Sequence, residues 1–232
     1  MGNRKTPKKV LDWFRSLTSG IIGCPDGTRV CANAVFDAKK YWEQRYRCGG
    51  TSGSGSEGIL AEYKAGVVNR FLREEQIHSV LEFGCGDGNQ LSLMEYKEYT
   101  GTDIAASALE LCRRKFQGKP NWRFLLYDPT RGVSPALPEV DLVVCLDVLY
   151  HIIEEQAFLT TLRDIFRCAK RYVILYTNIG SAENTPPHIK WRDTQACLAQ
   201  FPSFRVLEVL EQPYPALSGA NFILLARRDT GV

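Results

Sequence analysis

Three closely spaced glycines follow a short apolar segment of the chain. The segment VLEF ends at Phe83, and Gly84, Gly86 and Gly88 come next in the run GCGDGNQL. Glycine lets a backbone turn tightly and approach a bound molecule without a Cβ atom in the way, and the amide groups at a helix start attract polar ligand groups. The pattern therefore predicts a strand, a tight turn and a ligand lying directly against that turn.

Acidic residues accompany these glycines. Glu82 lies in the strand just before the turn, and Asp103 ends the next predicted strand, where a carboxylate can accept hydrogen bonds from both hydroxyls of a ribose. Asn89 stands where the dinucleotide fingerprint needs its third glycine, so a nicotinamide dinucleotide is disfavoured. An aspartate at such a position can also be only a turn residue or a helix cap.

Taken in order, these motifs resemble the motif set of the class I S-adenosylmethionine (SAM) dependent methyltransferases. The resemblance covers roughly residues 80–176 and includes ExGxGxG, TGTDIAASALELCRRKF, LLYD and VDLVVCLDVLYHI. It implies a methyltransferase with SAM as its cofactor. By this similarity SAM would be contacted by residues at four strand ends, namely Glu82, Gly84, Gly86 and Asp147 at its methionine end, Asp103 with the adjacent Ile104 at its ribose, and Asp128 near its adenine amino group.

Two histidines are candidates for acid–base chemistry. Methyl transfer from SAM is an in-line displacement at an activated carbon, so the protein mainly aligns the acceptor and excludes water, and a hydroxyl acceptor also benefits from a general base. His151 follows the fourth predicted strand and His188 follows the fifth. Each has a structural alternative, because His151 can cap a helix or orient Asp147, and His188 can be an exposed loop residue.

The acceptor is less well defined than the cofactor. We expect a small or medium-sized molecule, with an oxygen of a saccharide or secondary metabolite as the first hypothesis. An RNA or protein acceptor is an alternative that the basic N-terminus allows, and a SAM-binding module without activity is another. The formal net charge of +3 is too small to require a nucleic-acid partner.

The elements that must position these residues alternate along the chain. Segments rich in β-branched and aromatic residues predict seven strands, at residues 80–83, 99–103, 122–128, 140–147, 172–177, 204–211 and 221–227. Helical patterns occupy residues 59–72, 90–96, 107–116, 154–168 and 190–201. This alternation indicates a doubly wound, mostly parallel α/β sheet, and the short last connection predicts a hairpin with an antiparallel edge strand.

The chain length of 232 residues fits one α/β domain with an N-terminal extension. Residues 1–75 are predicted to form a helical cap with a Gly/Ser-rich loop, and residues 76–232 the SAM-binding core. By composition the run CGGTSGSGSEG at residues 48–58 is a flexible loop or linker. YWEQRY before it and HIKWR far downstream resemble a bacterial-type subgroup of these enzymes whose substrates are unassigned, and this resemblance implies a lid over SAM instead.

Composition narrows the classes of protein to which the chain can belong. Hydrophobic residues make up 44% and charged residues 24% of the chain, and no apolar run is long enough to span a membrane. The eight cysteines are scattered without a CxxC pair or a histidine cluster, so we expect reduced thiols, a cytoplasmic location and no metal site.

Overall fold

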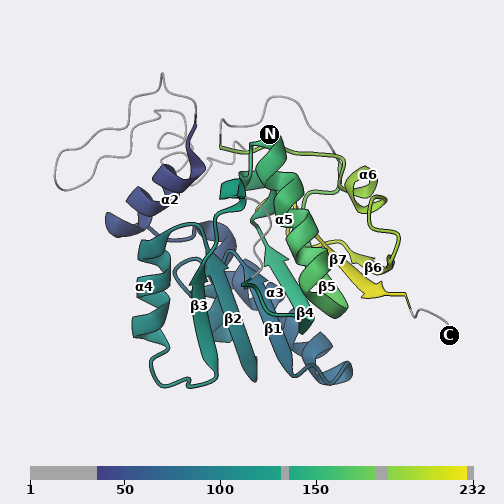
Figure 1. The fold of residues 1–232 in the computed structure, drawn as a ribbon, viewed down its shortest axis with the longest axis horizontal. Coiled ribbons are helices and arrows are strands. Elements are labelled where there is room, and N and C mark those ends of the chain that lie inside the picture. The colour runs from purple at the N-terminus through teal and green to yellow at the C-terminus, as the bar shows by residue number, and fades with distance from the viewer. Residues whose placement is uncertain (1–35, 132–135, 181–187, 229–232) are drawn as a thin grey trace, which may run out of the picture. The chain divides into compact units, whose positions relative to one another are not determined.

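The computed structural model describes residues 36–131, 136–180 and 188–228, and residues Ala38–Val232 form one unit. Its centre is a seven-stranded sheet, which confirms the predicted strands with small shifts at their ends (Figure 1). The strands are β1 (Ser79–Phe83), β2 (Glu98–Asp103), β3 (Trp122–Leu126), β4 (Val140–Leu146), β5 (Ala169–Thr177), β6 (Phe204–Leu210) and β7 (Asn221–Arg227).

The strand order is β3-β2-β1-β4-β5-β7-β6, and neighbouring strands from β3 to β5 run parallel. The chain moves outward from β1 to β3 on one side and then returns to place β4 on the other side of β1. This reversal is the topological switch point at which doubly wound sheets bind ligands. β7 pairs antiparallel with both β5 and β6, so the predicted hairpin is confirmed, and β6 takes the edge position.

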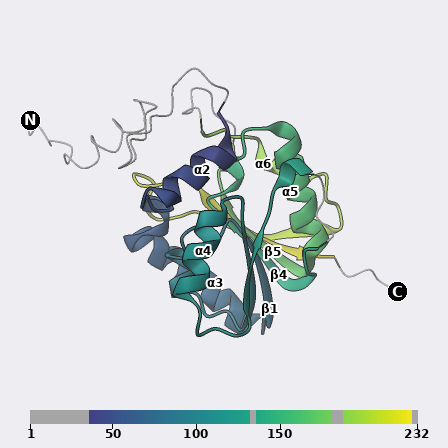
Figure 2. The same cartoon turned by 60° about the vertical axis from the view of Figure 1, so that its left-hand side comes forward.

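Successive residues of β4 point to opposite faces of the sheet, and different helices cover the two faces. Leu142 belongs to the same buried cluster as Val68 of α3 (Gly58–Glu74) and Leu109 of α4 (Ala106–Lys115). Val143 belongs to a second cluster with Leu162 of α5 (Glu155–Cys168). Figure 2 shows α3 and α4 on the side of the sheet opposite to α5, as the predicted architecture requires.

Two predicted helices are shorter than expected. In place of a helix at residues 90–96 there is a single 3₁₀ turn, Gln90–Leu93. The helix predicted at residues 190–201 is reduced to α6 (Thr194–Leu198). Asp193 sets its start, because its carboxylate accepts a hydrogen bond from Ala196 N at 3.0 Å, and Pro202 disfavours helical geometry at its far end.

The described residues include only part of the predicted N-terminal cap. Helical residues predicted before residue 36 lie outside the described residues. Within them, α2 (Ala38–Arg47) is helical as expected, and the Gly/Ser run that follows contains a 3₁₀ turn at Ser54–Ser56. Further 3₁₀ turns lie at Pro129–Arg131 and Leu149–His151.

Two further expectations concern membranes and thiols. Within the part of the chain that the structure describes, no helix is long and apolar enough to cross a bilayer. Among the described residues, free cysteines lie at five positions, namely Cys85, Cys112, Cys145, Cys168 and Cys197, and the first four of these are buried. The expectation of a reduced thiol is wrong at Cys48, which is disulfide-bonded.

Candidate functional site

The glycine-rich turn after β1 has the geometry that its sequence predicts. Gly84, Gly86 and Gly88 all have positive φ angles, of 80°, 55° and 75°. The amides of Gly84 and Cys85 donate to the carbonyl of Thr102 at 2.8 and 2.9 Å, which ties the turn to β2. A Cβ atom on Gly84 would lie 2.2 Å from the Cγ2 atom of Val148, so both the backbone conformation and the available space require glycine.

Alanine at Gly84 is therefore expected to lower the free energy of unfolding by at least about 1–3 kcal/mol, the range for a strained left-handed residue, with the steric overlap in addition. Gly66→Ala is the matched control. Gly66 lies on the exposed side of α3 and a Cβ there would meet no atom within 4 Å, so this change should stabilise the helix by about 0.4–1 kcal/mol. Urea unfolding measures both, and equal effects of the two changes would contradict the prediction.

Asp103 joins the glycine turn to the end of β2. Its carboxylate accepts a hydrogen bond from Gly86 N at 3.0 Å and another from Ala105 N at 2.9 Å, and the residue is only 8% exposed. Burial raises the pKa of Asp103 to about 6, although the backbone N–H groups favour the charged form. Ile104, directly after it, is half-buried. Each Asp103 oxygen retains a lone pair that a hydroxyl donor can use.

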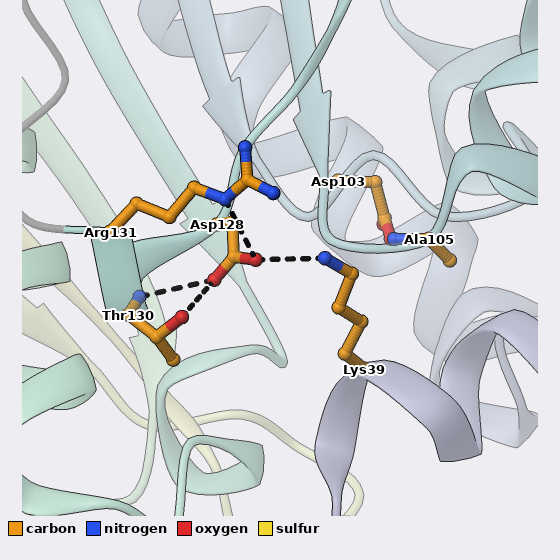
Figure 3. Close-up of polar contacts among 6 residues, drawn as sticks. All are labelled: Lys39, Asp103, Ala105, Asp128, Thr130 and Arg131. Carbon is orange, nitrogen blue, oxygen red and sulfur yellow. Dashed lines mark hydrogen bonds and ion pairs between the residues drawn. The ribbon is translucent and has the colours of Figure 1, made fainter.

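Asp128 lies beyond the end of β3, beside Asp103 in the view of Figure 3. Its carboxylate accepts from Lys39 Nζ of α2 at 2.8 Å and from the amide and hydroxyl of Thr130 at 3.1 and 2.6 Å. Arg131 Nε lies 3.8 Å away. Partial burial raises the pKa of Asp128, but the hydrogen bonds from Lys39 and Thr130 outweigh that effect and hold the pKa below its ordinary value. No sequence motif pointed to Lys39.

Asp147 follows β4 in a left-handed conformation, with φ of 60°, which is uncommon outside glycine. One carboxylate oxygen forms an ion pair with Lys64 Nζ at 2.5 Å, and the other accepts from the Tyr150 hydroxyl at 2.7 Å. Lys64 is 1% exposed and lies over the ring of Tyr176 at 5.3 Å. Lys64 was not predicted as a site residue, although a lysine within the apolar stripe of the 59–72 helix is a signal that could have identified it.

Glu82 lies at the end of β1 but faces the core. It is 3% exposed, and its carboxylate accepts from the Tyr99 hydroxyl at 2.6 Å. Burial raises the pKa of Glu82 to about 7, while Tyr99 and the nearby charge of Lys64 act in the opposite direction. The Glu82 carboxylate therefore links β1 to Tyr99 of β2.

The two candidate bases lie together. His151 Nδ1 contacts the carbonyl oxygen of His188 at 3.1 Å, and their rings stack with centroids 5.7 Å apart. Tyr41 also stacks on His188, and the rings of Trp42 and His151 meet edge to face. Burial lowers the pKa of His151 to about 4, so its ring is neutral at neutral pH. Burial and the nearby Arg45 also lower the pKa of His188.

The fold thus brings the predicted residues to one edge of the sheet. Gly86, Asp103, Asp128 and Asp147 lie at or just beyond the carboxyl ends of four strands that are neighbours in the order β3-β2-β1-β4. Such an edge combines a backbone free of side chains with carboxylates that can accept hydroxyl and amino hydrogens. In residues 36–131, 136–180 and 188–228, no group of three or more His, Cys, Asp or Glu residues is arranged to hold a metal ion.

Comparison with known proteins agrees with this geometry. Residues 80–171 match the family model of the methyltransferase domain. No curated protein matches the sequence of the chain. Solved structures with the same fold include magnesium protoporphyrin IX methyltransferase from Synechocystis with bound SAM, which is 17% identical with a TM-score of 0.60, and the match covers 85% of this chain and 100% of that one.

The N-methyltransferase NodS from Bradyrhizobium japonicum, in complex with S-adenosylhomocysteine (SAH), is 13% identical with a TM-score of 0.62, over 84% of this chain and 100% of that one. A SAM-dependent methyltransferase from Clostridium acetobutylicum is 12% identical with a TM-score of 0.58, over 73% and 92%. At these identities the structures establish the fold, whereas the family match covers the glycine turn and the carboxyl ends of β2, β3 and β4. The chain therefore contains a methyltransferase domain at residues 80–171, on a fold that it shares with SAM-dependent methyltransferases.

Proposed function

We propose that this enzyme transfers a methyl group from SAM to an oxygen of a small or medium-sized acceptor, such as a saccharide or secondary metabolite, in the cytoplasm. The position of the Asp103 carboxylate is the observation that best supports the placement of SAM. Gly86 N and Ala105 N hold that carboxylate at 3.0 and 2.9 Å, directly beside a turn that has no Cβ at Gly86. SAM fits this combination, because its ribose hydroxyls need hydrogen-bond acceptors and its methionine chain must lie close to the protein backbone.

In this proposal Gly84 and Gly86 form the backbone surface against which SAM lies. Asp103, beside Ile104, accepts hydrogen bonds from the ribose hydroxyls, and Asp128 accepts one from the adenine amino group. Glu82 and Asp147 shape the methionine end. Both oxygens of Asp147 are already bonded, to Lys64 and Tyr150, so we assign it the task of fixing the turn after β4. Bound SAM would supply a methyl group already activated by the sulfonium.

For an oxygen acceptor, His151 would act as the general base. A carbonyl oxygen only accepts hydrogen bonds, so Nδ1 is the protonated nitrogen in the contact with His188, which leaves a lone pair on Nε2. Because burial lowers the pKa of His151 to about 4, that lone pair is available at neutral pH to accept the hydroxyl hydrogen of the acceptor. His188 would position the ring of His151.

Replacing His151 with alanine is expected to lower turnover by about 10²–10⁴-fold, the usual contribution of a general base, with little change in SAM affinity. His188→Ala should lower turnover less, because the carbonyl that His151 uses remains. His78→Ala is the control, since His78 lies just before β1 and pairs with Glu98 at 3.1 Å, at the opposite edge of the sheet. Full activity of the His151 variant would remove it from the mechanism.

The acceptor class is tested by incubating the enzyme with methyl-labelled SAM and with saccharides, small hydroxylated metabolites, RNA and protein in parallel. Label in a hydroxyl of a small molecule supports the proposal. Label in RNA or protein would replace the acceptor assignment, and strong salt dependence of binding would accompany an RNA acceptor. Tight SAM binding without transfer to any acceptor would instead indicate a SAM-binding module without activity.

A further inference from the structure

A glycine-rich loop crosses the edge of the sheet at which we place SAM. We name this segment, residues 49–58, the lid loop. It runs from the end of α2 to the first residue of α3. A Cβ atom on Gly55 of the lid loop would lie 3.0 Å from Asp147 Oδ2, so the loop also reaches the end of β4. α2 is anchored to the core independently, by Lys39 on Asp128 beyond β3 and by Glu43, whose carboxylate accepts from Ser107 N of α4 at 3.1 Å.

Ser52 fastens the lid loop to the glycine turn through a reciprocal pair with Asp87. Ser52 N donates to Asp87 Oδ2 at 3.0 Å, and the Ser52 hydroxyl donates to Asp87 Oδ1 at 2.9 Å. In return, Asp87 N donates to the Ser52 hydroxyl oxygen at 3.1 Å. Arg45 of α2 supports this position of the loop, because its Nε donates to the Thr51 carbonyl at 2.5 Å.

The side chain of Ser52 fills the space on the side of Gly86 where a Cβ atom would lie. A Cβ atom built on Gly86 would lie 2.2 Å from the Ser52 hydroxyl oxygen and 3.1 Å from the Tyr46 hydroxyl. Because this space is too small for a methyl group, a cofactor chain cannot lie on that side of Gly86 while Ser52 keeps this position. The residue that makes close backbone approach feasible is therefore covered by the side chain of the lid loop.

The lid loop also has the backbone needed to move. Gly49, Gly53 and Gly58 have φ angles of 77°, 98° and 55°, and they lie on both sides of Ser52. A Cβ atom on Gly49 or Gly58 would meet nothing within 4 Å, so these two glycines are not required by packing. Glycines at the ends of a loop allow the large dihedral changes of a hinge.

We infer that the lid loop is an autoinhibitory latch, which the Ser52–Asp87 pair holds closed over Gly86 and which must open before SAM can bind. The inference rests on the proposed function, because it takes the face of Gly86 as the place of the cofactor. A protein that binds its ligand only in the open state shows an affinity reduced by the fraction that is open. Weakening the latch should therefore strengthen SAM binding.

The test is Ser52→Ala, which removes the two hydrogen bonds between the hydroxyl and Asp87 and its contact with the Tyr46 hydroxyl at 3.2 Å, and keeps the bond from the Ser52 amide to Asp87. SAM binding is followed by stopped-flow tryptophan fluorescence, for which Trp42, stacked on Tyr46 at 5.8 Å, is a nearby reporter. In the unaltered enzyme the observed rate should reach a plateau set by loop opening. In the Ser52→Ala enzyme we expect a plateau about tenfold higher and SAM affinity severalfold tighter. Asp87→Asn should act in the same direction.

Ser54→Ala is the matched control, because Ser54 belongs to the same loop but is exposed, and its rates should equal those of the unaltered enzyme. An observed rate that rises linearly with SAM concentration, or weaker SAM binding by the Ser52→Ala enzyme, would overturn the latch alone. The second result would mean that Ser52 contacts the bound cofactor. Failure of every variant and of the unaltered enzyme to bind SAM or SAH would overturn the proposed function, and the latch with it.

Discussion

Replacing Asp103 with alanine is expected to weaken SAM binding by about a hundredfold, or about 3 kcal/mol. The change removes the charged acceptor of two ribose hydroxyls, and hydrogen bonds to a charged group contribute about 1.5–3 kcal/mol each. It also frees the amides of Gly86 and Ala105, which now donate to this carboxylate at 3.0 and 2.9 Å. Isothermal titration calorimetry with SAM and with SAH measures the loss.

Asp141→Ala is the matched control for this measurement. Asp141 also accepts hydrogen bonds from two backbone amides, those of His78 and Ser79 at 3.1 and 3.0 Å, but it lies at the amino end of β4. The Asp141→Ala change should alter SAM affinity by less than about twofold relative to the unaltered enzyme, whatever its effect on the free energy of unfolding. Unchanged affinity in the Asp103 variant would show that the ribose lies elsewhere.

The pH dependence of binding gives a second measure of the same group. Burial raises the pKa of Asp103 to about 6, so the carboxylate gains a proton as the pH falls through that value. SAM affinity should then fall, by up to about tenfold per pH unit below 6, and this dependence should be absent in the Asp103 variant. The effect on stability has the opposite sign, because the folded state binds this proton more tightly than the unfolded chain, and stability from this group is lost as the pH rises through about 6.

Replacing Lys64 with methionine is expected to lower the free energy of unfolding by about 3–5 kcal/mol. The change keeps the apolar stem in the core but leaves Asp147 without the cation that lies 2.5 Å away, and a largely buried carboxylate without its partner is costly. Urea unfolding of the variant, with the unaltered enzyme beside it, measures the loss. A loss below about 1 kcal/mol would show that the ion pair contributes little.

The double variant Lys64→Met with Asp147→Asn separates a charge effect from a packing effect. Asparagine tolerates the left-handed conformation at position 147 and can still accept from the Tyr150 hydroxyl, but it carries no charge. Stability should recover by about half or more, since no buried charge remains unpaired. A double variant no more stable than Lys64→Met alone would assign the loss to packing of the lysine stem.

The elements of this enzyme could be predicted because their signals are local. The apolar run before Phe83, the glycines after it and Asp103 at the next strand end lie within a few residues of the turns that they form, and the structure places all of them as expected. The helix predicted at residues 190–201 was too long because a capping residue and a proline limit it to Thr194–Leu198.

The sequence by itself thus determined the seven strands, the alternating architecture, the glycine turn and the edge at which the acidic residues gather, because each follows from periodicity or from backbone conformation within one element. Only the tertiary structure decided which side chains meet at that edge. Lys64 and Asp147 are 83 positions apart, Lys39 and Asp128 are 89 apart, and Ser52 and Asp87 are 35 apart. These pairs form when a helix or loop packs across the sheet, and no pattern of spacing along the chain records which residues that packing brings into contact.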